Sequence, residues 1–276
     1  MSFFSNLLGY VLNFIYSLIN NYGIAIILFT ILIKIILLPM SIKQQKTLKK
    51  TEKIQAEVKK IQEKYGKGNQ EKKNQEVMAL YQKENMNPLG GCFGSIIQIV
   101  LLLAMFLLVR DPLTYMKKAD AEEINRYKQL VVEQGTSMSQ TYPEISIIRY
   151  VKENNILDSN LYINTNFFGL DLSQVPKENS RDYKVYIIPV LYVISSFISI
   201  KFTTKKTEEV KEKDCNKKET EEQIPQMNST MTWFIPIMAV TISFVAPLGL
   251  ALYWLVNNIL TIFERVFADK MLKDEN

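Results

Sequence analysis

One charged side chain stands in the middle of an apolar stretch near the start of the chain. The nineteen residues from Ile24 to Ile42 contain a single ionisable group, Lys34. This is about the length that an α-helix needs to cross the hydrocarbon core of a bilayer. A lysine at that depth costs at least about 2.5 kcal/mol on insertion scales, so it marks a candidate functional site that faces protein or a wet cavity. Lys34 is therefore the first residue from which a binding site can be built.

Other apolar stretches carry hydroxyl, amide and indole side chains that could line a polar groove with this lysine. They are Thr30, Ser95, Gln98, Trp254 and Asn258. Thr30 lies one helical turn before Lys34, and Trp254 and Asn258 are four residues apart, so each pair shares a helix face. Each also has a structural alternative. The lysine could bind a backbone carbonyl or a lipid phosphate, the amides could join neighbouring helices, and the tryptophan could be a packing or interfacial aromatic.

The residue types that are missing exclude most catalytic chemistry. The chain has no histidine, which removes the usual acid-base residue and the Ser-His and Cys-His nucleophile pairs. The predicted spans contain no Asp or Glu, which argues against an intramembrane aspartyl protease or a carboxylate proton relay. No phosphate-binding GxxxxGK[ST] loop is present. We expect a protein that is not an enzyme and that needs no cofactor and no metal.

Apolar and charged blocks alternate along the 276 residues, as in a polytopic membrane protein. We predict an all-α fold with a core of five transmembrane helices. The predicted spans are 24–42, 93–109, 185–200, 233–246 and 248–263. The last two come from one apolar stretch divided at Pro247, and each is shorter than a usual span. Short spans thin the bilayer or gather into a bundle, which favours a mechanism that lowers the membrane barrier.

Two segments outside the spans have helical patterns of their own. Residues 1–22 carry no charged side chain and repeat apolar residues at helical spacing, which predicts an extra-cytoplasmic amphipathic helix in the membrane interface. Residues 43–88 hold twelve Lys and six Glu around a narrow apolar stripe, which predicts a cytoplasmic basic helical hairpin. The hairpin is either a solvated element or a docking element for anionic lipid headgroups or ribosomal RNA.

The connecting segments set the predicted topology. Residues 110–184 form a mixed-charge loop with short helical patterns and too few apolar residues for a core of its own. Residues 201–232 read as a disordered loop, and 264–276 as a polar tail. With 43–88 inside, the inner segments hold 22 of the 33 Lys and Arg residues, so the positive-inside rule places the N-terminus outside and the C-terminus inside.

Four features, in this order along the chain, resemble YidC-type membrane protein insertases. They are the cation in the first span, a basic hairpin leading to Asn87-Pro88-Leu89-Gly90-Gly91-Cys92 and Gln98, the run Phe168-Gly169-Leu170-Asp171-Leu172, and Pro247-Leu248-Gly249-Leu250-Ala251-Leu252-Tyr253-Trp254 with Asn258. Two positions depart from the family pattern. The cation is usually arginine, whereas Lys34 can lose its proton when desolvated. The segment after Cys92 lacks the usual proline.

The resemblance implies an insertase of the bacterial cytoplasmic membrane in the five-span form of Gram-positive bacteria. Its partners would be nascent membrane proteins, with the Sec translocon, the ribosome and anionic lipid headgroups as further partners. No DNA partner is expected, and the chain would act as a monomer. Lys34, Gln98, Trp254 and Asn258 would line a groove closed towards the outside, with Thr30 and Ser95 beside them. A substrate's hydrophilic tail would enter it while the apolar segment slides into lipid.

Two other functions fit parts of the sequence. A small-solute anion transporter or channel could use Lys34 as its binding cation, although transporters commonly show repeated halves with paired broken helices, and no such repeat is present here. A membrane scaffold could recruit partners through the basic hairpin, but it would leave the buried charge unexplained. Insertion of a polypeptide into vesicles separates the insertase from both alternatives.

Overall fold

The structure is a computed structural model, and it describes residues 2–65, 69–83, 90–135, 138–156, 160–179, 181–212, 238 and 240–274. The chain divides into two compact units, and each is described by itself below. The first unit comprises Met1–Leu32 with Ala104–Ile262, and the second comprises Ile33–Leu103 with Phe263–Asn276.

Helices dominate the described residues, and strands occur there only as one short hairpin. The elements are α1 Ser2–Ile19, α2 Tyr22–Tyr65, α3 Gln70–Lys83, α4 Gly90–Arg110, the π-helical turn η1 Leu113–Lys117, α5 Ala121–Glu133, α6 Pro143–Glu153, β1 Asn166–Phe167, β2 Leu170–Asp171, the 3-10 turn η2 Tyr183–Tyr186, α7 Ile187–Glu212 and α9 Leu248–Asp274. This content confirms the helical class predicted from the sequence.

Three helices are long and apolar enough to cross a membrane. The segments are Tyr22–Thr47, Tyr183–Ile200 and Leu248–Met271. They coincide with the first, third and fifth predicted spans. In the region of the second predicted span, Ile99–Arg110 forms a shorter apolar helix. Six of the fourteen residues of the fourth predicted span, 233–237 and 239, lie outside the described residues, so the five-span count stays a prediction.

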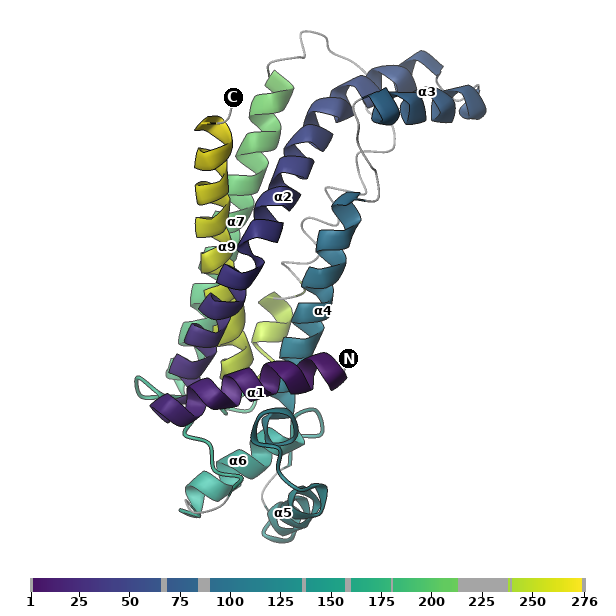
Figure 1. Ribbon diagram of the computed structural model, residues 1–276. Helices are drawn as coiled ribbons and strands as arrows, with labels where there is room; N and C mark the ends of the chain where they lie inside the picture. Colours follow the sequence, from purple (N-terminus) through teal and green to yellow (C-terminus); the bar gives the residue numbers. More distant parts are fainter. Residues whose placement is uncertain are drawn as a thin grey trace. The chain divides into compact units, whose positions relative to one another are not determined.

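In the first unit, α1 packs against η1 and exposes one apolar face. Figure 1 shows α1 as the purple helix at the N-terminus. The exposed face repeats at intervals of three and four residues and consists of Phe3, Leu7, Tyr10, Phe14 and Leu18. The opposite face is buried, with Leu12 fully covered. At Gly9 the helix approaches η1 so closely that an added Cβ would lie 1.9 Å from the backbone oxygen of Tyr115. The outward face of α1 is thus apolar, and its close contact with η1 requires glycine at position 9.

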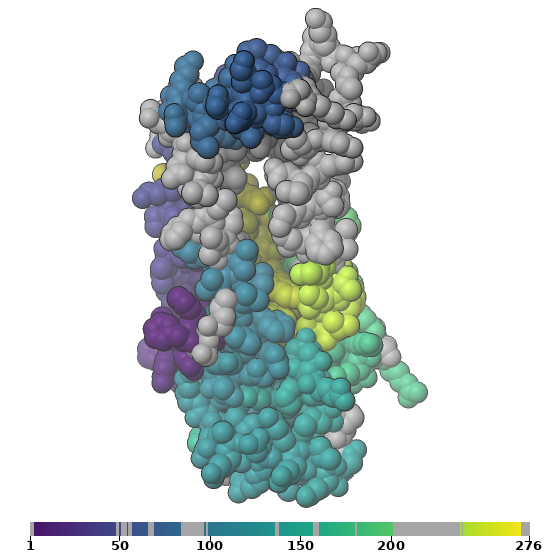
Figure 2. Space-filling model, turned by 90° about the vertical axis from the view of Figure 1, so that its right-hand side faces the viewer, coloured from purple at the N-terminus to yellow at the C-terminus, as the bar shows by residue number. Residues whose placement is uncertain are grey.

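Residues 110–184 build a core that the sequence reading underestimated. The side chains of this segment, in teal, form one continuous mass (Figure 2). Fully or almost fully buried are Leu113, Met116, Val131, Ile147, Ile148, Val151, Leu161 and Ile163. Glu144 is also buried. Its carboxylate accepts hydrogen bonds from the backbone amides of Leu113 and Thr114 at the start of η1, and these bonds compensate its burial. The apolar residues of the loop alone are too few for a core, but this core also uses α1, which packs against η1.

Helix α7 extends beyond the predicted end of the third span at residue 200. The backbone of α7 is helical to Glu212, so the first twelve residues of the loop predicted to be disordered continue the helix. Lys and Glu, which are frequent there, are good helix formers. Pro189 lies in the first turn of α7, where its missing N–H has no helical partner to lose. Pro189 therefore does not interrupt the helix.

The second unit contains the rest of α2 with α3. Helix α2 is continuous for 44 residues through Pro39, so the first predicted span and the first arm of the predicted hairpin form one helix. The narrow apolar stripe packs against α3: Ile54, Val58 and Leu80 are buried in one cluster. At the far end of α2, Lys64 and Tyr65 both bond to the carboxylate of Glu76 in α3.

Candidate functional site

The intramembrane lysine lies next to a carboxylate. In the second unit the Nζ atom of Lys34 is 3.0 Å from Oε2 of Glu264, and the two side chains are only 18% and 9% exposed. Both residues lie within segments long and apolar enough to span a membrane, Tyr22–Thr47 and Leu248–Met271. A pair with this geometry is a charge-assisted hydrogen bond, which compensates part of the cost of removing both charges from water.

The position of Glu264 corrects two sequence inferences. The fifth span was predicted to end at residue 263, before this glutamate, but α9 continues to Asp274 and its apolar segment is 24 residues long. An acidic residue therefore lies inside a candidate span, contrary to the inference that the spans hold no Asp or Glu. The fifth span is also not short, so it gives no support to a mechanism by bilayer thinning. The span was predicted to end at Phe263 because Glu264 is charged. Hydropathy alone cannot show that this charge is paired with Lys34 on another helix.

Three further predicted groove residues are placed only in part. Ser95 and Gln98 lie on α4, and their side chains are outside the described residues. Thr30, one turn before Lys34 on α2, belongs to the first unit and is buried. Its hydroxyl donates to the backbone carbonyl of Ile26 at 2.6 Å, so that hydrogen is used within the helix. A groove lined by these three residues stays a prediction.

Asn258 and Trp254 face α7 within the first unit. The amide nitrogen of Asn258 donates to the hydroxyl oxygens of Ser195 and Ser196 at 3.0 and 3.2 Å. The ring of Trp254 packs on Tyr192 with a centroid distance of 5.9 Å. These contacts match the structural alternatives, in which an amide joins two helices and a tryptophan packs between them. We define this contact between α7 and α9 as the polar seam.

The polar seam shows which residues the sequence analysis missed. Tyr192, Ser195 and Ser196 are spaced by three and four residues, so their polar groups share one face of α7. That spacing of hydroxyls within an apolar span was a usable signal. The sequence signal for Glu264 was weaker: it is an acidic residue that directly follows the apolar run.

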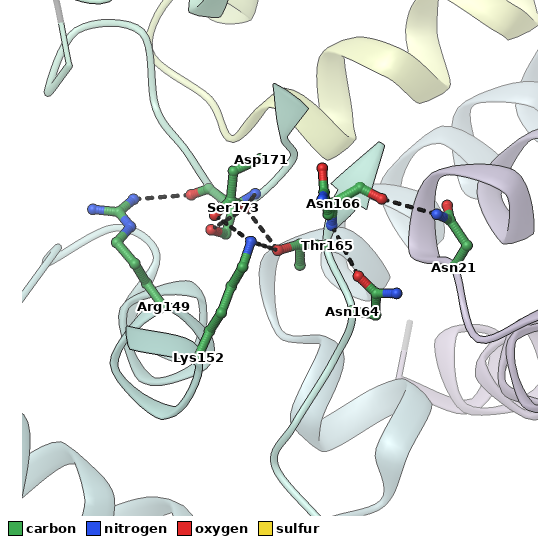
Figure 3. A network of polar contacts seen from close by, with 8 residues as sticks. All are labelled: Asn21, Arg149, Lys152, Asn164, Thr165, Asn166, Asp171 and Ser173. Atoms are coloured by element: carbon green, nitrogen blue, oxygen red, sulfur yellow. Dashed lines mark hydrogen bonds and ion pairs between the residues drawn. The ribbon is translucent and has the colours of Figure 1, made fainter. Parts of the chain in front are cut away.

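A second polar network joins the ends of three helices in the first unit (Figure 3). The hairpin β1–β2 turns at Phe168 and Gly169, whose φ angles of 49° and 80° are those of a tight hairpin turn. The side-chain amide of Asn21, before α2, donates to the carbonyl of Asn166 in β1. The first amides of α9 donate to the carbonyls of Leu172 and Gln174, directly after β2. The hairpin segment therefore holds the starts of α2 and α9 together.

Asp171 is the centre of this network. Its carboxylate accepts bonds from Lys152 of α6 at 2.7 Å, from Thr165 at 2.6 Å, and from the amide and hydroxyl of Ser173 at 3.0 and 2.7 Å. Arg149 adds a bond to the carbonyl of Ser173. Burial raises the pKa of Asp171, but the hydrogen bonds from Lys152, Thr165 and Ser173 outweigh it and lower the pKa below its usual value. The carboxylate is ionised at neutral pH and structural.

No metal centre forms within the part of the chain that the structure describes. There, no three acidic or cysteine side chains come close enough together to hold an ion. The buried charges instead pair with each other, as Lys34 does with Glu264 and Lys152 with Asp171. The arrangement can bind and orient charged or polar groups.

Comparison with known proteins gives a consistent result over almost the whole chain. Residues 14–275 match the family model described as 60Kd inner membrane protein. A membrane protein insertase YidC of Caldanaerobacter subterraneus is 28% identical over 98% of this chain and 97% of its own length. The same name belongs to a Fusobacterium nucleatum protein that is 28% identical over 98% of both chains. Membrane protein insertase YidC 2 of Bacillus anthracis is 28% identical over 94% of this chain and 72% of its own.

Proposed function

This chain belongs to the 60Kd inner membrane protein family, and from that premise we propose that it moves polypeptide segments from the cytoplasm into the bilayer through a hydrophilic groove. The relatives carry the name membrane protein insertase, and together with the apolar helices they indicate a membrane protein of this type in a bacterium. The groove is the finer step, and the buried Lys34 is the observation that carries it.

The proposed groove residues are Lys34, Ser95 and Gln98. A charged group between apolar helices needs water or a polar partner, because an isolated charge in hydrocarbon is expensive. A hydrophilic tail that passes along this wet path leaves bulk water only partly, while the adjoining apolar segment moves into lipid. The step needs no covalent chemistry. Trp254, Asn258 and Thr30 support the groove through helix packing in this proposal, rather than by contacting the substrate.

The surroundings of the groove follow the same proposal. The exposed apolar face of α1 would lie in the outer membrane interface, with the hairpin segment at the outer ends of α2 and α9. The positively charged residues between 43 and 83 would face the cytoplasm, near anionic lipid headgroups, a ribosome or the Sec translocon. The N-terminus would be outside and the C-terminus inside.

Reconstituted vesicles test the proposal. A single-span substrate with a short acidic outer tail is offered to vesicles that contain wild type, Lys34→Arg, Lys34→Ala or no protein. We expect a protease-protected tail with wild type and Lys34→Arg, and a reduced yield with Lys34→Ala. Wild-type vesicles that protect no more tail than empty ones would refute the insertase.

The second candidate function, an anion transporter, is distinguished in the same vesicles. It rests on the same buried cation, Lys34, as an anion-binding group. Uptake of small anions by vesicles that give no protected tail would favour it. Insertion without anion uptake would exclude it.

A further inference from the structure

The charge of Lys34 is already matched from within the protein. Glu264 Oε2 lies 3.0 Å from the ammonium group, and its side chain is the more deeply buried of the two. The next two charged residues of α9, Arg265 and Asp269, are four apart on one helix face and opposite in sign. Lys34 and Glu264 together carry no net charge, so the site is not a fixed positive charge that draws in every acidic group.

From this pair we infer that Glu264 determines which substrates the lysine accepts, by occupying the place that an acidic group of the substrate would take. The inference rests on the proposed insertase function and concerns the selectivity of its site. An acidic tail gains the ammonium group only when it replaces the Glu264 carboxylate. A neutral tail gains nothing from that replacement, and it passes while the internal pair stays formed.

The position of Glu264 on α9 allows such an exchange. It precedes the end of the apolar segment at Met271 by seven residues, or about 10 Å along the helix. The α9 helix continues to Asp274, and the residues after Glu264 include Arg265, Asp269 and Lys270. A carboxylate released from Lys34 therefore remains on the more polar end of α9, whereas Lys34 lies twelve residues from the start and thirteen from the end of its apolar segment Tyr22–Thr47.

Removing the internal carboxylate separates this role from a purely structural one. Glu264→Gln keeps the size and a hydrogen-bonding oxygen but leaves the lysine without its matched charge. The vesicle assay is run with two substrates that differ only in the outer tail, one acidic and one neutral. We expect Glu264→Gln to raise the ratio of acidic to neutral insertion by about tenfold, which corresponds to the lower end of what a hydrogen bond to a charged group contributes, about 1.5 kcal/mol.

Two further variants make the result interpretable. Glu63→Gln removes the same charge from an exposed Lys59–Glu63 pair in the same unit, where the side chain is 66% exposed, and should leave the ratio unchanged. If Glu264→Gln does not fold, the double variant Lys34→Gln/Glu264→Gln removes both charges and should insert the two substrates equally. A wild-type ratio in folded Glu264→Gln would overturn the inference, and so would unequal insertion of the two substrates by the double variant, even while wild type inserts both substrates. Failure of wild type to insert either substrate would instead refute the proposed function.

Discussion

Replacing Asp171 by asparagine should loosen the hairpin segment that holds the starts of α2 and α9. The substitution keeps the shape of the side chain but removes its charge and one of its two accepting oxygens. Lys152 would then lie 2.7 Å from an amide that no longer matches its charge. The bonds from Thr165 and Ser173 would compete for the oxygen that remains.

The size of the effect follows from these bonds. A hydrogen bond to a charged group contributes about 1.5–3 kcal/mol, and the Asp171 carboxylate is only 21% exposed. Because the asparagine retains part of the network, we expect a loss of about 2–3 kcal/mol in the free energy of unfolding. For a chain of this size, that loss lowers the melting temperature by about 5–10 °C.

The pH dependence provides a second readout with a defined sign. The pKa of Asp171 is lowered in the folded protein by its hydrogen bonds, so its contribution is complete above the unfolded carboxyl pKa of about 3.9. That contribution is lost as pH falls through the lower folded value. The difference in melting temperature between wild type and Asp171→Asn should therefore be constant near neutral pH and shrink below about pH 4.

Thermal unfolding in detergent, followed by circular dichroism, measures both effects. Asp182→Asn is the matched control, since Asp182 is exposed and its carboxylate bonds to the backbone amide of Lys184. It should change the melting temperature much less. Equal melting temperatures for wild type and Asp171→Asn at neutral pH, or a difference that stays constant in acid, would refute the reasoning.

Two other contacts in the first unit give predictions. In Gly9→Ala the new Cβ would have to retreat from 1.9 Å to at least 3.4 Å from the backbone oxygen of η1, so we expect a loss of about 1–3 kcal/mol in thermal stability. Ser17→Ala, on the exposed face of the same helix, should have little effect, and equal losses would contradict the close contact. In the polar seam, a double-mutant cycle of Asn258→Leu with Ser195→Ala should give a coupling energy of about 0.5–1.5 kcal/mol. A coupling energy of zero would mean that this hydrogen bond does not hold α7 to α9.

The sequence was informative wherever the structure of a segment depended on the residues of that segment alone. Apolar length and period located α1 and the apolar parts of α2, α7 and α9, and one charge in an apolar run was enough to single out Lys34. The hydrophobic stripe on residues 54–61 predicted a helical hairpin, and in the structure this stripe packs against α3. In each case the signal is local, because burial imposes a period on neighbouring residues.

What the sequence could not supply were the contacts between distant segments. Glu264 is paired with a residue 230 positions away, so hydropathy placed it in a polar tail. Asn258 was expected in a groove, but which neighbour an amide meets depends on how the helix is rotated, and in the structure it meets two serines of α7. The Asp171 run was recognised only as part of a family resemblance. Its role in joining α6, the hairpin and α9 depends on the fold.

Contact between an entering chain and position 98 tests insertion through the groove most directly. A photoreactive amino acid replaces Gln98 in one variant and Ile36 in another. Ile36 is 61% exposed and lies two residues beyond Lys34, on the opposite side of α2. With a ribosome-bound membrane protein halted during insertion, we predict cross-links to its hydrophilic tail from position 98 and few from position 36. Absence of cross-links from position 98, or equal yields from both positions, would contradict passage through the groove.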